Sequence, residues 1–195
     1  MNPRVSDSIR EYYSVMDSPK IQKLTARTKE DAAKLHVSLS AAFPAVSKPI
    51  VTDYGKCVEI RAYFDRQAPE LGSGWQIVRD YILRNGQPWW ILSIFLSWVG
   101  PYAAVHLGSS SIGPGGQLID NQASKDLEKT RSEEHVRMEI RSLGYEVLTE
   151  ADLATPIAVD PKRMRELDGT YVPPTTVGRC LFYPWWGPDL WVAVR

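Results

Sequence analysis

The chain has 195 residues, and its 23 Lys and Arg balance its 23 Asp and Glu, so the formal net charge is zero with His neutral. This balance disfavours general nucleic-acid binding, because nucleic-acid-binding proteins carry surplus cations that displace counterions from phosphates. Two cysteines are too few for a disulfide scaffold or a four-cysteine zinc site, and they indicate a reducing compartment.

Neither a secretory signal nor a membrane span is expected. The first twenty residues contain Asp7, Glu11 and Asp17 and lack the continuous apolar run of a signal peptide. The most apolar segment, 89–107, is divided by Gly100-Pro101, and each half is shorter than the roughly 20 residues that a spanning helix needs. We therefore expect a cytoplasmic protein.

Two helices are predicted in the N-terminal region. The first should end before Pro19, and its apolar residues recur at the spacing of one helix face: Ile9, Tyr12, Tyr13 and Met16. Thr28 and Asp31 form a variant of the capping box, which predicts that the second helix begins at Thr28. Pro44 should end it.

The middle of the chain has the pattern of a sheet with one helix. Apolar residues partly alternate with polar ones over 50–64, which predicts a strand. Trp75, Val78, Tyr81 and Ile82 recur at helical spacing, and Asn85-Gly86 should end this helix. The aromatic and β-branched segments 90–98 and 102–107 predict a hairpin at the centre of the sheet.

A long loop is expected over 108–129, because this segment has little apolar content and four glycines within nine positions. Thr130 and Glu133 then form a capping box for a helix that Gly144 should close. A short strand at 145–148 and a helix beginning at Thr149 follow. Segments 177–183 and 190–194 are predicted as strands.

These elements predict a single α+β domain over residues 1–195, with a mostly antiparallel sheet and helices packed on one face. The loop at 108–129 is its longest irregular segment.

The motifs of common active sites and cofactor sites are missing. Neither His-x-x-x-His nor Cys-x-x-Cys occurs, so we expect no metal. Cys57 and Cys180 are flanked by apolar residues and should be inert. The glycines at 113–116 are not followed by Gly-Lys-Ser/Thr, and the serines at 109–111 lack the Gly-x-Ser-x-Gly elbow. We assign no catalytic residue and no cofactor.

Tryptophan is the unusual residue, with seven in the chain. Six of them form two clusters: Trp89, Trp90 and Trp98, then Trp185, Trp186 and Trp191. Adjacent residues of a strand point to opposite faces of the sheet, so Trp89 and Trp90 cannot both enter a one-sided core. Trp89, Trp90, Trp98, Trp185 and Trp186 are therefore candidates for a partner-binding surface. If helices cover both faces of the sheet, these rings are core residues instead.

Three functions remain open, and a cytoplasmic protein-binding module that is not an enzyme is preferred because every enzyme signature is missing. The second is a small enzyme whose catalytic residues are scattered in sequence, with His36, His106 and the loop after Gly108 around one pocket. The third is a carbohydrate-binding protein that uses the tryptophan clusters.

In general character, the chain resembles the small bacterial immunity proteins that neutralise a toxin in the cytosol. Like them, it is a compact, neutral, tryptophan-rich α+β chain without a catalytic motif or an export signal. The resemblance extends over the whole chain and involves no specific residue motif. It implies a surface that covers a toxin's active site, with charged residues steering the encounter and aromatic residues slowing dissociation.

Overall fold

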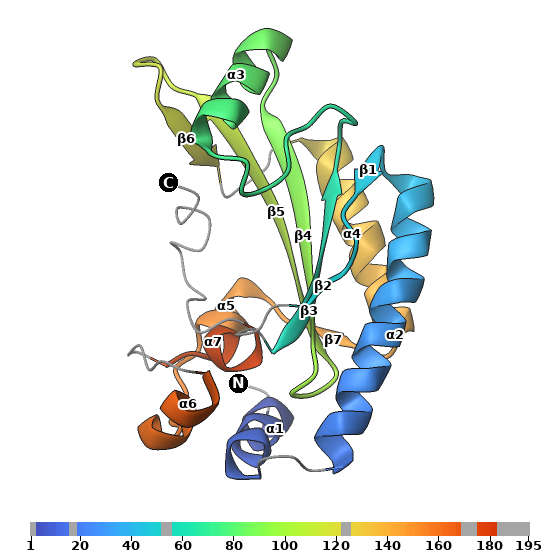
Figure 1. Cartoon of the computed structure of the whole chain (residues 1–195), viewed down its shortest axis with the longest axis vertical. Helices are drawn as coiled ribbons and strands as arrows, with labels where there is room; N and C mark the ends of the chain where they lie inside the picture. The colour runs from blue at the N-terminus through green and yellow to red at the C-terminus, as the bar shows by residue number, and fades with distance from the viewer. Residues whose placement is uncertain (1–2, 16–18, 52–55, 122–125, 169–174, 183–195) are drawn as a thin grey trace.

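The computed structural model describes residues 3–15, 19–51, 56–121, 126–168 and 175–182. Within these residues, seven strands form one sheet and seven helices surround it (Figure 1). The strands are β1 (Ala45–Val46), β2 (Ile50–Val51), β3 (Cys57–Tyr63), β4 (Trp89–Ser97), β5 (Tyr102–Ile112), β6 (Leu118–Asn121) and β7 (Glu146–Val147). The helices are α1 (Pro3–Ser14), α2 (Pro19–Ala42), α3 (Trp75–Asn85), α4 (Leu127–Ser142), α5 (Glu150–Ala154), α6 (Pro161–Asp168) and α7 (Val177–Leu181). The α+β class is confirmed.

The sheet is mostly antiparallel, as predicted. Its strand order is β1-β3-β4-β5-β6, with β2 paired to β3 and β7 paired in parallel to β5. The predicted central hairpin is β4–β5, in which Ser93 lies opposite His106. Since side chains alternate between faces, this register determines which residues of the hairpin share a face.

Helices α2 and α4 cover one face of the sheet (Figure 1). The other face carries two separate apolar clusters. At one end of the sheet, α1, α5, α6 and α7 bury residues that include Ile9, Phe95 and Phe182. At the other end, α3 packs on Tyr63, Trp89 and Ile91. Helices were expected on one face only, and the structure places them on both. Strand β4 is buried almost throughout for this reason.

The second helix begins earlier than predicted. Pro19 is the first residue of α2, a position that suits proline because the first amides of a helix have no partner within it. Thr28 and Asp31 therefore lie in the middle of α2 and are buried, rather than forming a cap.

Membrane crossing would require a longer apolar run than any helix of the described segments provides.

The loop expected over 108–129 is largely regular structure, and that prediction is wrong. Strand β5 continues to Ile112, and a tight turn at residues 113–116 leads into β6. Gly116 has a φ of 78°, so the glycines there make the turn of a hairpin. Helix α4 begins at Leu127, capped by Asp126 instead of Thr130.

The C-terminal region differs most from its prediction. Residues 177–181 form helix α7 rather than a strand, and the Thr176 hydroxyl accepts from the amide of Arg179 at its start. Residues 161–168, where no element was predicted, form α6. The strand predicted at 190–194 lies outside the described residues. The helix predicted at Thr149 is confirmed as α5, with a complete capping box to Asp152.

Candidate functional site

The predicted tryptophan surface is only partly within the described residues. Trp89 and Trp90 point to opposite faces of the sheet, as expected. Trp89 is a core residue, since it is 5% exposed and its Nε1 donates to the Pro69 carbonyl at 3.1 Å. Trp90 and Trp98 are half-buried against the α2–α4 cluster. Trp185, Trp186 and Trp191 lie outside the described residues.

The two histidines of the enzyme alternative do not share a pocket. His106 alternates with Val105 and Leu107, which face α2 and α4, so its imidazole lies on the opposite face of the sheet. His36 belongs to α2, which lies over the Val105 side. The sheet therefore separates the two side chains.

A polar row crosses the face of the sheet opposite α2. The strand register places Arg61, Ser93 and His106 side by side on β3, β4 and β5. Arg61 forms a two-pronged ion pair with Glu59, at 2.6 and 3.0 Å. The Ser93 side chain is fully buried, and its hydroxyl has no hydrogen-bond partner among the described residues.

Burial keeps His106 neutral. It lowers the pKa of the imidazole to about 4, and the Arg137 guanidinium adds to the shift by electrostatic repulsion. The negative charge of Glu150 would raise the pKa of His106, since Glu150 Oε1 lies 3.8 Å from His106 Nδ1. That carboxylate is 84% exposed, so water screens its charge and desolvation prevails. Because Ser93 is buried, a substrate cannot reach its hydroxyl, and the neighbouring His106 is too weak a base to activate it as a nucleophile.

Helix α3, at the upper end of the molecule in Figure 1, carries exposed apolar side chains. Val78, Tyr81 and Ile82 are buried there, as predicted. Trp75, by contrast, is 53% exposed, and Ile77 and Leu83 are similarly exposed at 53% and 56%. We call the exposed arc of this helix the α3 surface: Trp75, Gln76, Ile77, Asp80, Leu83 and Arg84.

Sequence reasoning assigned Trp75 to the core stripe because it lies three residues before Val78. As the first residue of the helix, however, it has no preceding turn to cover it. The break at Gly72-Ser73-Gly74 was the available signal that the helix begins there, with Gly72 and Gly74 at positive φ.

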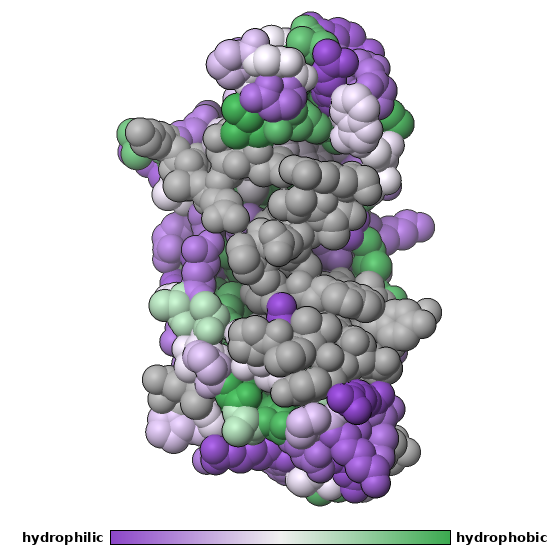
Figure 2. Space-filling model, turned by 90° about the vertical axis from the view of Figure 1, so that its left-hand side faces the viewer, coloured by the Kyte–Doolittle hydropathy of each residue, from purple (hydrophilic) through white to green (hydrophobic). Residues whose placement is uncertain are grey.

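Helix α3 is attached to the β5–β6 hairpin beneath it. The Arg79 Nε donates to the Gly116 carbonyl at 3.2 Å, and Leu118 packs against the α3 cluster. Ile119, from the next position of β6, is 38% exposed. Figure 2 shows hydrophobic residues among hydrophilic ones at this end of the molecule. Apolar groups within a polar surround are the usual anatomy of a protein interface.

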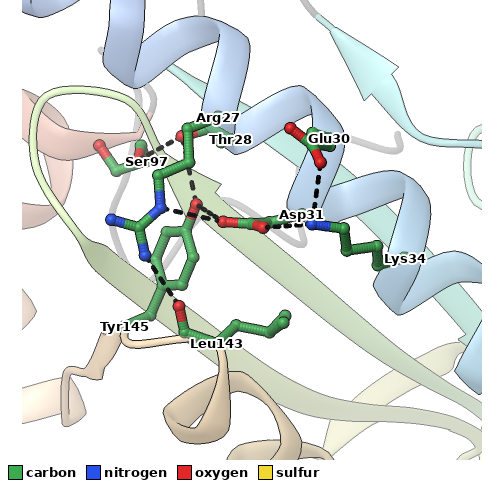
Figure 3. A network of polar contacts seen from close by, with 8 residues as sticks. All are labelled: Arg27, Thr28, Glu30, Asp31, Lys34, Ser97, Leu143 and Tyr145. Atoms are coloured by element: carbon green, nitrogen blue, oxygen red, sulfur yellow. Dashed lines mark hydrogen bonds and ion pairs between the residues drawn. The ribbon is translucent and has the colours of Figure 1, made fainter.

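A polar network fixes the middle of α2 to the rest of the protein (Figure 3). The Thr28 hydroxyl donates to the Ser97 carbonyl, and the Tyr145 hydroxyl lies 3.3 Å from both Thr28 Oγ1 and Asp31 Oδ2. Arg27 bonds to Asp31 and to the Leu143 carbonyl. Burial, first among several causes, raises the pKa of Tyr145, so this phenol remains protonated.

A shallow hollow lies next to this network, toward the start of α2. Its volume is about 360 Å³, and its lining residues are Pro19, Lys20, Lys23, Leu24 and Arg27. Since Lys20, Lys23, Leu24 and Arg27 follow the helical repeat, they share one face of α2.

The described residues hold no group of three or more His, Cys, Asp or Glu side chains placed to bind a metal ion. The chain matches no protein-family model, no curated protein and no solved structure. The geometry of the molecule is thus the basis for its proposed function.

Proposed function

We propose that the protein is a non-enzymatic binding module that recognises another protein through the α3 surface. The observation that carries this proposal is the exposure of Trp75, Ile77 and Leu83 on one helix, each more than half accessible to water. Burying apolar area contributes roughly 25 cal/mol per Å², and tryptophan anchors often dominate the affinity of an interface.

The polar residues of this surface fit the same role. Gln76 donates to Asp80 at 2.9 Å, and Arg84 is exposed in the last turn of the helix. Such groups at the margin of a contact contribute to specificity and to the rate of encounter more than to affinity.

We further propose that binding is inhibitory and takes place in the cytoplasm. The resemblance to toxin-immunity proteins supports a toxin as the partner, with the α3 end of the molecule covering the toxin's active site. Such a mechanism needs a rigid complementary surface and no chemistry in the inhibitor.

The proposal is tested by capture from a lysate of the native organism on immobilised protein. We expect a specific partner to be retained by the wild type and lost with Trp75→Ala or Leu83→Ala. With the purified partner, Trp75→Ala should weaken binding by about 30-fold, which corresponds to roughly 2 kcal/mol.

The matched control is Val37→Ala, which truncates a side chain that is 71% exposed on α2, the helix that covers the opposite face of the sheet from α3. It should retain the partner at wild-type affinity. Equal retention by the wild type and both α3 variants would contradict the proposal, as would the absence of any specifically retained protein.

A further inference from the structure

The turn that ends α3 contains an exposed Asn-Gly pair. Asn85 is the last residue of the helix, and Gly86 follows it in the left-handed conformation, with a φ of 65°. Asn85, Gly86 and Gln87 are all exposed. Of the three asparagines in the chain, only Asn85 precedes a glycine. The pair therefore combines solvent access with a sequence that has its own chemistry.

An Asn-Gly pair reacts without an enzyme. The backbone nitrogen of the glycine loses its proton to solvent base and attacks the side-chain amide carbon of the asparagine. The new carbon–nitrogen bond closes a five-membered succinimide ring, and the side-chain nitrogen leaves as ammonia after taking up a proton. Water then opens the ring at one of its two carbonyls, so the product is isoaspartate or aspartate. Glycine favours the attack because it has no Cβ to obstruct it.

The turn has room for this ring. Among the described residues, none forms a hydrogen bond with the Asn85 side chain, so its amide is open to attack. A Cβ built on Gly86 would meet no heavy atom of a non-neighbouring residue within 4 Å. Solvent base and water therefore have access to both reacting groups.

The closed helix keeps the two groups from reacting. The Gly86 N–H donates to the Ile82 carbonyl at 2.8 Å, which completes the last turn of α3. Attack on Asn85 requires this hydrogen bond to break and the Asn85 backbone to leave the helical conformation. Leu83 and Arg84, in the same turn, are exposed, and helix ends with few buried contacts open locally. Opening of this turn therefore sets the rate of the reaction.

We infer that Asn85 is a site of spontaneous deamidation, controlled by opening of the last turn of α3. The product places a carboxylate at the C-terminal end of the helix, where the helix dipole disfavours negative charge. The new charge also lies next to Arg84 in sequence, a member of the α3 surface. A consequence for binding rests on the proposed function: deamidation weakens the partner contact as the protein ages.

Peptide mapping by mass spectrometry tests the site after incubation of the full chain in neutral and in mildly alkaline buffer. We expect the mass change from amide to acid at Asn85, and faster conversion at the higher pH because the attacking nitrogen must lose its proton. The chain unfolded in guanidinium chloride should react about tenfold faster, which corresponds to an opening free energy of about 1.4 kcal/mol for the last turn.

Asn85→Gln is the matched control, because it keeps the amide while its longer side chain closes a ring far more slowly. It should show no conversion at this position. Asn121, which does not precede a glycine, is the internal reference and should remain unconverted over the same period. Asn85→Asp has the charge of the product and should bind a captured partner more weakly than Asn85→Gln does.

Equal rates in the folded and unfolded chains would overturn the control by helix opening. An Asn85 that stays intact in the folded chain while the unfolded chain reacts would overturn the site itself, as would equal conversion of Asn121. These measurements need no partner, so they give a result even if the α3 proposal fails. Equal partner binding by Asn85→Asp and Asn85→Gln would overturn only the consequence for binding.

Discussion

At the scale of single residues, two side chains of the same type show how position decides their role. Trp89 and Trp75 are both tryptophans on regular elements, but one is 5% exposed and hydrogen-bonded while the other is 53% exposed. For Trp89 the sequence left two readings open, a partner surface or the core of a sheet covered on both faces. For Trp75 the helical spacing grouped it with Val78, Tyr81 and Ile82, which are buried.

We predict that Trp89→Ala lowers the free energy of unfolding by about 3–5 kcal/mol, because it empties the centre of the α3 cluster. Trp75→Ala should change it by less than about 0.5 kcal/mol. Urea unfolding of both variants measures the difference. Comparable losses would show that Trp75 is a structural residue and would weaken its case as a binding anchor.

His106 predicts a pH dependence of stability. Above its ordinary pKa of 6.5 the imidazole is neutral in the folded and unfolded chains. Between pH 6.5 and about 4 the unfolded chain binds a proton that the folded chain does not, so the free energy of unfolding falls as the pH falls. The full loss is roughly 3 kcal/mol for a shift of this size.

Urea unfolding at several pH values across this window measures the effect, with His106→Gln as the test variant. It should lose less stability on acidification than the wild type. His135→Gln, which alters an exposed imidazole, should follow the wild type. A wild-type pH profile in His106→Gln would contradict the assignment.

At the scale of elements, helix ends are where sequence reasoning and structure differ most. The helix predicted from Thr130 begins at Leu127, because the Asp126 carboxylate accepts from the amides of Glu128 and Lys129. The Thr130 hydroxyl instead donates to the Asp126 carbonyl within the first turn. Both residues are good caps by type, and only the fold selects between them.

We therefore predict that Asp126→Ala lowers the free energy of unfolding by about 1 kcal/mol, while Thr130→Ala lowers it by less than about 0.5 kcal/mol. Chemical denaturation of the two variants is the measurement. A larger loss with Thr130→Ala would mean that α4 is capped where the sequence pattern placed it.

Elements with strong local signals were predictable, and those that depend on distant contacts were not. The β4–β5 hairpin follows from two apolar segments around Gly100-Pro101, and α5 follows from its capping box. Helix α7 has apolar residues that also suit a strand, and packing among α1, α5 and Phe95 stabilises the helical form. The start of α2 was missed because Pro19 can end one helix or begin another.

The candidate site was less predictable than the fold. The alternation of side chains along β4 correctly predicted that Trp89 and Trp90 point to opposite faces of the sheet. No local pattern in the sequence shows that α3 covers Trp89. The positions of His36 and His106 likewise depend on which face of the sheet α2 covers. Such information resides in the packing of elements far apart in the chain.

At the scale of the whole molecule, the face opposite α2 has two apolar clusters of different size. The cluster under α1 and α7 contains residues from most of the C-terminal helices, whereas the α3 cluster has few members. We predict that hydrogen exchange in α3 occurs through local opening and is faster than in the central β4–β5 pairs. Exchange measured at residue resolution tests this, and equal protection in α3 and β4 would contradict it.

Strand β5 runs without interruption from Tyr102, in the α1–α7 cluster, to Ile112, beside α3. Arg79 fastens α3 to the turn at the far end of that strand. The two apolar clusters on this face are separate, so β5 and the neighbouring strand β4 form the continuous connection between the two ends of the protein.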